Sequence, residues 1–305
     1  MSNPSSIQSD PSMIGGVPKA PFARLPDPES VFAQRAMRFR TLAETSGLAP
    51  YLMFLAGLAD VQVKTLPLLP EPDRPDTAVL ARAGQFAMPP FDRGTFKSDS
   101  VLRETCERLL EDLAAVPKPE AAETALQRVR RTDGPGRDQM IVNILADSIP
   151  FEDVAEHIYV AAALQVHFAR LASRLDVAAL VPVGVGACPV CGGPPIASLV
   201  VGWYGAEGAR YASCALCSTL WNEVRVKCLV CGSTKGIGYQ EVDGGAGTIK
   251  AETCDECISY VKILYQNKDV MLDPVADDVA SLGLDLLLRG GTYRRAGVNP
   301  YLLGY

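Results

Sequence analysis

The chain has few of the residues on which most catalytic sites depend. It contains only two histidines, His157 and His167, in 305 residues. They fall ten positions apart in one helical stretch, about 80° apart around the axis, so they cannot form an i, i+4 ligand pair. A P-loop, a Gly-x-Ser-x-Gly elbow and a Gly-x-Gly-x-x-Gly turn are also missing. We therefore expect both histidines to pack, predict no catalytic residues, and do not expect an enzyme.

Long hydrophobic runs and an excess of basic residues are missing as well. No run of 18 apolar residues occurs, which predicts no membrane span. The first 13 residues are polar and lack the basic and apolar regions of a signal peptide. The net charge of −6 and the pI near 5.1 argue against a general nucleic-acid binder.

Cysteine is what the chain has in a distinctive pattern. Eight of its nine cysteines form four Cys-x-x-Cys pairs, separated by 22, 10 and 22 residues. The spacing indicates one two-pair unit used twice with a period of 40, as copies 186–222 and 226–262. The copies also agree beyond the cysteines, because Cys188-Pro-Val-Cys-Gly192 aligns with Cys228-Leu-Val-Cys-Gly232.

This spacing is typical of tetrahedral metal sites. Two residues between cysteines allow a tight turn that directs both sulfurs at one point, and the following glycine tolerates a positive φ. Two such knuckles make a closed four-sulfur site that suits iron or zinc and excludes hard cations. The predicted ligands are Cys188, Cys191, Cys214 and Cys217 for site 1, and Cys228, Cys231, Cys254 and Cys257 for site 2.

Two alternatives remain open for these sites. Ligation across the copies is an alternative to ligation within each copy, because only ten residues separate Cys217 from Cys228. The metals could also act solely as structural staples, which is the usual role of closed four-cysteine sites. Either way, metal-spaced cysteines and the isolated Cys106, expected to be a small buried hydrophobe, fit a reducing cytoplasm.

The charge of the cysteine block also bears on partners. Residues 182–265 contain six Lys or Arg and seven Asp or Glu. Each four-thiolate centre with a divalent ion adds about −2, so the block is anionic and lacks the electrostatic attraction that drives phosphate binding. We therefore predict no nucleic-acid partner.

The periodicity of the remaining chain predicts an N-terminal all-α bundle, a duplicated rubredoxin-like or zinc-ribbon-like four-cysteine module, and a C-terminal helix. The bundle should contain six or seven helices, the longest near Pro150–Leu180, and no strand is expected before Val183. The predicted segments are a disordered N-terminus at 1–20, a helical domain at 21–181, the tandem metal module at 182–265, and a helix and tail at 266–305 that pack on the rest.

The C-terminal helix has its own signals. Asp273 is expected to cap it, and a position in the first turn explains Asp277 and Asp278 without a catalytic role. Its apolar face is predicted to consist of Val279, Leu282, Leu286 and Leu287.

Several aromatic and basic residues cluster around the knuckles in the sequence. They could form a partner-binding patch, or they could pack on the metal sites and neutralise their charge. The candidates are Trp221, Arg225, Tyr239, Tyr260 and Lys262.

These motifs, in this order, resemble the formate dehydrogenase accessory protein family (FdhE). The resemblance covers roughly residues 185–300, and it includes Trp221 with Arg225, Asp273–Asp278 and Asn299-Pro300 as well as the cysteine pairs. It implies a cytoplasmic assembly factor required for active respiratory formate dehydrogenase, which contacts the catalytic subunit and holds iron in rubredoxin-like sites. The alternatives are a rubredoxin-type one-electron carrier with small partners, and zinc as the metal. The sequence leaves a homodimer open.

Overall fold

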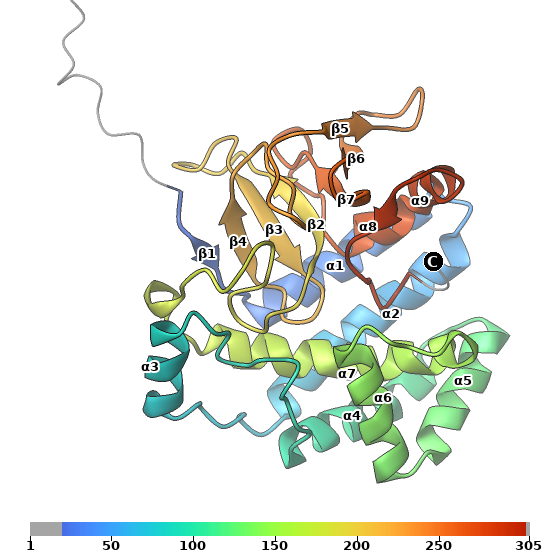
Figure 1. Ribbon diagram of the computed structural model, residues 1–305. Coiled ribbons are helices and arrows are strands. Elements are labelled where there is room, and N and C mark those ends of the chain that lie inside the picture. The colour runs from blue at the N-terminus through green and yellow to red at the C-terminus, as the bar shows by residue number, and fades with distance from the viewer. Residues whose placement is uncertain (1–19, 303–305) are drawn as a thin grey trace, which may run out of the picture.

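The computed structural model describes residues 20–302, so the predicted disorder of residues 1–20 falls almost wholly outside the described residues, as does the end of the tail at 303–305. Figure 1 shows three parts: a group of helices, a sheet that bears the cysteines, and helix α7 between them. This arrangement confirms the predicted fold class, with a helical N-terminal region, a sheet region and C-terminal helices.

The helical region has seven α-helices between residues 20 and 182, as the periodicity predicted. They are α1 (Pro28–Ala43), α2 (Ala49–Thr65), α3 (Thr77–Gln85), α4 (Ser100–Asp112), α5 (Glu120–Arg131), α6 (Gly134–Leu145) and α7 (Val154–Ser173). Short 3-10 turns are η2 (Leu66–Leu68), η3 (Leu113–Ala115), η4 (Phe151–Asp153) and η5 (Val177–Ala179). The longest helix is shorter than expected, because Pro150 and Asp176 begin separate 3-10 turns at its two ends.

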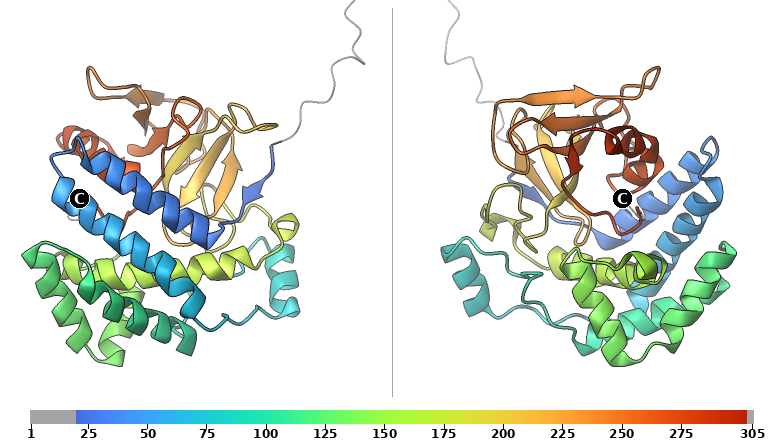
Figure 2. Two further views of the ribbon diagram at one scale, coloured as in Figure 1. Left: turned by 180° about the vertical axis from the view of Figure 1, so that it is seen from behind. Right: turned by 45° about the vertical axis from the view of Figure 1, so that its right-hand side comes forward.

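Helix α7 is the centre of the core. Sixteen of its twenty residues are buried, as expected of a helix covered on all sides. Both histidines lie on it and have packing environments: His157 Nδ1 lies 2.6 Å from the Asp153 carbonyl, and burial lowers the pKa of His167 to about 4. Figure 2 shows α7 covered by the sheet on one side and by α4 to α6 on the other.

The sheet has eight strands in the order β1-β4-β3-β2-β7-β6-β5, with β8 beside β7. They are β1 (Ala23–Arg24), β2 (Pro195–Val200), β3 (Arg210–Cys214), β4 (Leu220–Glu223), β5 (Ile237–Gln240), β6 (Ile249–Cys254), β7 (Ser259–Leu264) and β8 (Arg294–Arg295). Each copy is an antiparallel meander, so the predicted hairpins gain a third strand. The copies join where β2 runs parallel to β7. The expectation of no strand before Val183 was wrong, because β1 extends the edge at β4.

The C-terminal segment departs from its predicted face. It forms α8 (Ala276–Ala280) and α9 (Leu282–Arg289), which are separated at Ser281. Leu286 and Leu287 are 50% and 67% exposed, whereas Leu284 and Leu288 are buried. The break at Ser281 changes the orientation of α9 relative to α8. An apolar face extrapolated along one continuous helix therefore includes Leu286 and Leu287, which are exposed.

The acidic pair on α8 is also more than a helix start. Asp277 and Asp278 are both fully buried. Asp277 pairs with Arg38 at 2.7 Å, and Asp278 pairs with Arg295 at 2.6 Å and Lys262 at 3.2 Å. These pairs attach the segment to α1 and to β7. Within residues 20–302, no helix combines the length and apolar character needed to cross a bilayer.

Candidate metal centres

Site 1 lies at the inner end of the first copy. Its first cysteine pair lies in knuckle 1, residues 187–193, and its second at the end of β3. The Cys188 and Cys217 sulfurs are 3.5 Å apart, and those of Cys191 and Cys214 are 3.4 Å apart. None of the four is more than 2% exposed.

Site 2 repeats this arrangement in the second copy. Its first cysteine pair lies in knuckle 2, residues 227–233, and its second at the end of β6. The Cys228 and Cys257 sulfurs are 3.6 Å apart, and those of Cys231 and Cys254 are 3.7 Å apart. Cys231 is exposed and Cys257 half-buried, so this site faces solvent on one side.

The sulfur spacing in both sites suits a tetrahedral ion. In each cluster all four sulfurs lie within 4.8 Å of one another, and each cluster contains cysteines of one copy only. A metal with bonds of about 2.3 Å to sulfur holds its ligands about 3.8 Å apart, whereas a disulfide brings its sulfurs to about 2 Å. The two clusters could therefore hold metal ions with the within-copy grouping that the duplication favours.

Burial gives a second reason to expect a cation. Burial raises the pKa of the Cys188 thiol well above its ordinary value, and it raises the pKa of Cys228 to about 12. The four buried sulfurs of site 1 cannot all be thiolates unless a positive ion compensates them. A bound metal supplies that charge, and its binding releases protons.

The backbone of the two knuckles is nearly identical. Cys188 N donates to Gly193 O at 2.9 Å, and Cys228 N donates to Ser233 O at 2.8 Å. The glycine after each pair has a positive φ, +75° at Gly192 and +77° at Gly232. This conformation is the one the sequence assigned to these glycines.

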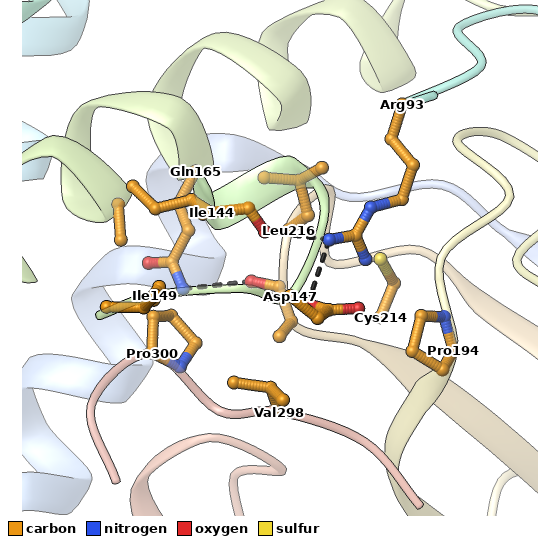
Figure 3. A pocket seen from close by; sticks show the side chains of 12 residues that line it. Arg93, Ile144, Asp147, Ile149, Gln165, Pro194, Cys214, Leu216, Val298 and Pro300 are labelled. Atoms are coloured by element: carbon orange, nitrogen blue, oxygen red, sulfur yellow. Dashed lines mark hydrogen bonds and ion pairs between the residues drawn. The ribbon is translucent and has the colours of Figure 1, made fainter. Parts of the chain in front are cut away.

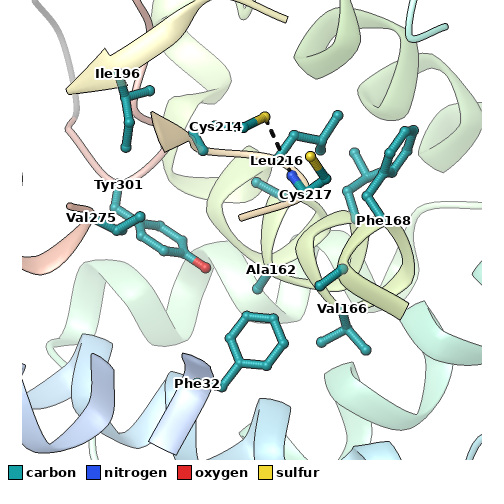
Figure 4. Close-up of a cluster of buried hydrophobic side chains, with 14 of the residues drawn as sticks. Phe32, Ala162, Val166, Phe168, Ile196, Cys214, Leu216, Cys217, Val275 and Tyr301 are labelled. Atoms are coloured by element: carbon teal, nitrogen blue, oxygen red, sulfur yellow. Dashed lines mark hydrogen bonds between the residues drawn. The ribbon is translucent and has the colours of Figure 1, made fainter. Parts of the chain in front are cut away.

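The helical region covers site 1. Phe91 N donates to Val190 O and Arg93 N to Cys191 O, each at 3.0 Å, so the loop that follows α3 pairs with knuckle 1. On another side, Figure 4 shows Phe168 of α7 near Leu216 and Cys217. Site 1 is thus part of the main hydrophobic core.

A small cavity lies beside Cys214, between the helices and the C-terminal tail. Figure 3 shows Val298 and Pro300 of the tail on one side of it and Arg93 on another. Arg93 donates to Ile144 O and to Asp147, each at 2.8 Å, so its positive charge is paired with acceptors at the C-terminal end of α6. Gln165 donates to Ala215 O at 2.8 Å and fixes the turn that carries Cys214.

One buried ion pair connects the two copies. Arg210 of β3 donates to Glu252 of β6 at 2.7 Å, and neither residue is more than 4% exposed. Arg210 also donates to Lys227 O at 2.9 Å, directly before the first ligand of site 2. Sequence reasoning missed this pair, since nothing in the spacing places Arg210 opposite Glu252.

The five candidates for a partner patch do not share one surface. Trp221, Tyr260 and Lys262 are buried, at 2%, 5% and 1% exposure. Lys262 Nζ lies 2.5 Å from Asp285 and Tyr260 donates to the same carboxylate at 2.7 Å, which favours the packing interpretation for both. Arg225 and Tyr239 are exposed and remain available to a partner.

Comparison with known proteins identifies the family. Three successive FdhE family models match the chain: the N-terminal model at residues 20–185, the central domain at 187–225 and the C-terminal domain at 226–302. The chain belongs to the FdhE family. The boundary between the central and C-terminal FdhE models falls between the two cysteine copies.

Individual FdhE proteins agree along almost the whole chain. A protein FdhE homolog of Rhizobium meliloti (strain 1021) is 54% identical over 99% of both chains. One of Haemophilus influenzae (strain PittEE) is 30% identical over 97% of this chain and 96% of its own. The crystal structure of the FdhE protein from Pseudomonas aeruginosa superposes with a TM-score of 0.82 at 30% identity, covering 93% of this chain and 99% of that one.

Proposed function

We propose that this protein is a non-enzymatic accessory factor required for the maturation of active respiratory formate dehydrogenase. It acts in the cytoplasm by direct contact with the catalytic subunit. The observation that carries the proposal is FdhE family membership together with two complete four-cysteine clusters. The identity of the client comes from the family resemblance and not from the geometry.

The proposed cofactors are two metal ions, one at each cluster, with iron preferred and zinc as the alternative. All eight donors are thiolate sulfurs, which both metals accept. Metal analysis of protein purified without oxygen decides between them. Iron predicts red protein that bleaches on reduction, whereas colourless protein containing zinc would remove the redox role and leave the assembly role intact.

The proposal is tested by an anaerobic pull-down of the tagged protein from its own cells while formate dehydrogenase is being made. Recovery of the catalytic subunit is the expected result. A deletion strain should also contain the catalytic subunit in inactive form. Normal formate dehydrogenase activity in that strain would contradict the proposal.

A second candidate function is a rubredoxin-type one-electron carrier with small partners. The exposure of Cys231 at site 2 favours it, because electron transfer requires a centre near the surface. The deletion experiment separates the two functions: a carrier is bypassed by an added artificial electron donor, whereas a missing maturation step is not.

Two further expectations belong to this proposal. Arg225 and Tyr239 are the exposed members of the proposed partner patch, so charge reversal or truncation there should weaken client binding. A homodimer is a separate hypothesis, and light scattering of the purified protein measures it directly. No nucleic-acid partner is proposed.

A further inference from the structure

The two knuckles have the same backbone but different surroundings. In knuckle 1 the carbonyls of Val190 and Cys191 accept hydrogen bonds from the loop segment at residues 89–93. Val190 and Cys191 are both fully buried beneath it. The segment is supplied by the same chain, from the loop that follows α3.

The equivalent positions in knuckle 2 are Val230 and Cys231. Val230 is 40% exposed and Cys231 is exposed. No donor within residues 20–302 is hydrogen-bonded to either carbonyl. Because the knuckle backbones match, these two acceptors have the same local arrangement as those that residues 91 and 93 use in knuckle 1.

Exposed apolar side chains lie on knuckle 2 and next to its partner cysteine pair. Val185 lies against Gly232 and is 53% exposed, and Ile258, next to the ligand Cys257, is 37% exposed. We call Val185, Val230 and Ile258 the site 2 lip. Exposed apolar side chains close to free backbone acceptors suit an added backbone segment that donates N–H groups and covers the side chains.

Ile258 adds a second, independent observation. Its φ is +55°, a conformation that costs a β-branched residue about 1–2 kcal/mol. The equivalent residue in the first copy is Ser218, at φ +56° and almost buried. The second copy thus carries an exposed, strained isoleucine where a small polar residue would be more stable, and strain of this kind concentrates at binding sites.

We propose that knuckle 2 is the docking site for a short loop segment of the client protein, which pairs with Val230 and Cys231 as residues 91–93 pair with Val190 and Cys191. The segment donates two backbone N–H groups from residues two apart, as Phe91 and Arg93 do in knuckle 1. Like Phe91, it places a large apolar side chain beside the knuckle, over the lip. This inference rests on the proposed function for the identity of the client.

The test is a binding titration of full-length protein with the purified catalytic subunit of formate dehydrogenase. Val230→Glu places a charge in the lip and should raise the Kd at least about tenfold. Val142→Glu is the matched control, because Val142 is 53% exposed on α6, and it should leave the Kd unchanged. Metal content is measured on every variant.

Ile258→Asn keeps the test valid if Val230→Glu loses metal. Asparagine tolerates a positive φ but lacks the apolar side chain, so this variant should stay folded and metal-loaded while binding the client more weakly. A folding defect cannot produce that combination.

The outcomes separate the two proposals. Failure of the wild-type protein to bind the subunit would refute the proposed function and, with it, the client assignment. Wild-type binding with unchanged affinity in both lip variants would overturn the docking site alone. A lip variant that abolishes self-association instead, seen by light scattering, would make a second copy the occupant and would also overturn it.

Discussion

The two cysteine copies have one local design in two different settings. Site 1 has four buried sulfurs and is covered by α7 and by residues 89–93. Site 2 has the same knuckle, the same glycine conformation and nearly the same sulfur spacing, yet exposes Cys231. The difference shows that the cysteine spacing determines the arrangement of the four sulfurs, whereas contacts from the rest of the chain determine how far each cluster is exposed.

This contrast suggests a division of roles. A buried four-sulfur site in the main core contributes its binding energy to the fold as a whole. A site at the surface can exchange ligands or electrons with another molecule, because the ligands or electrons do not have to pass through the hydrophobic core. We expect site 1 to act mainly as a staple and site 2 to be the centre that partners approach.

The largest expected effect comes from removing one ligand at each site. Cys188→Ala and Cys228→Ala should each reduce the metal content from two ions to one per chain. Cys188→Ala should also lower the free energy of unfolding by at least about 4 kcal/mol, because site 1 is part of the core. Cys228→Ala should cost less and act mainly on its own copy.

Elemental analysis and denaturant unfolding of the two variants check this prediction. Two metals retained by either variant would refute the ligand assignment. Equal losses of stability would show that burial does not distinguish the sites.

The next effect concerns the connection between the copies. Arg210→Met leaves the Glu252 carboxylate buried without its partner, which should cost about 3 kcal/mol. The double variant Arg210→Met with Glu252→Leu should recover most of that loss, since it removes both charges. Thermal unfolding of the single and double variants measures the coupling, and additive losses would mean that the pair does not join the copies.

Much of this comparison was predictable from the sequence, and its limits have physical causes. A Cys-x-x-Cys knuckle is a local structure, so four of them and a period of 40 gave both clusters and their grouping. The parallel contact between β2 and β7 joins segments more than 60 residues apart in the chain. No local pattern encodes a contact of that kind.

The buried charges show the same limit. Lys262 was open to two interpretations, a partner surface or packing beside the metal site, because its position near the knuckles in the sequence fits both. It is buried because Asp278 and Asp285 arrive from the C-terminal segment. Asp277 and Asp278 lie in the first turn of α8, as the sequence predicted, but their pairing with Arg38, Arg295 and Lys262 has no local signal. Only the tertiary fold brings these charges together.

A smaller effect should separate the two sites kinetically. A coloured chelator in excess should remove the metal of site 2 at least about ten times faster than that of site 1, since Cys231 can be reached from solvent. Ten-fold corresponds to about 1.4 kcal/mol in the barrier. The release should show two phases of equal amplitude, and Cys228→Ala should lack the fast one. A single phase in the wild-type protein would contradict the difference between the sites.

The smallest expected effect concerns the residue that follows the last ligand of each site. Ile258→Asn should raise the free energy of unfolding by about 1 kcal/mol, because asparagine adopts a positive φ with less strain. The reverse change in the first copy, Ser218→Ile, should destabilise by about the same amount or more, since Ser218 is almost buried. Denaturant titrations with both metals bound measure each difference. A loss of stability in Ile258→Asn would show that the isoleucine packs favourably in the isolated protein. A gain would show that the isoleucine lowers the stability of the fold, which a role of its exposed side chain in binding explains.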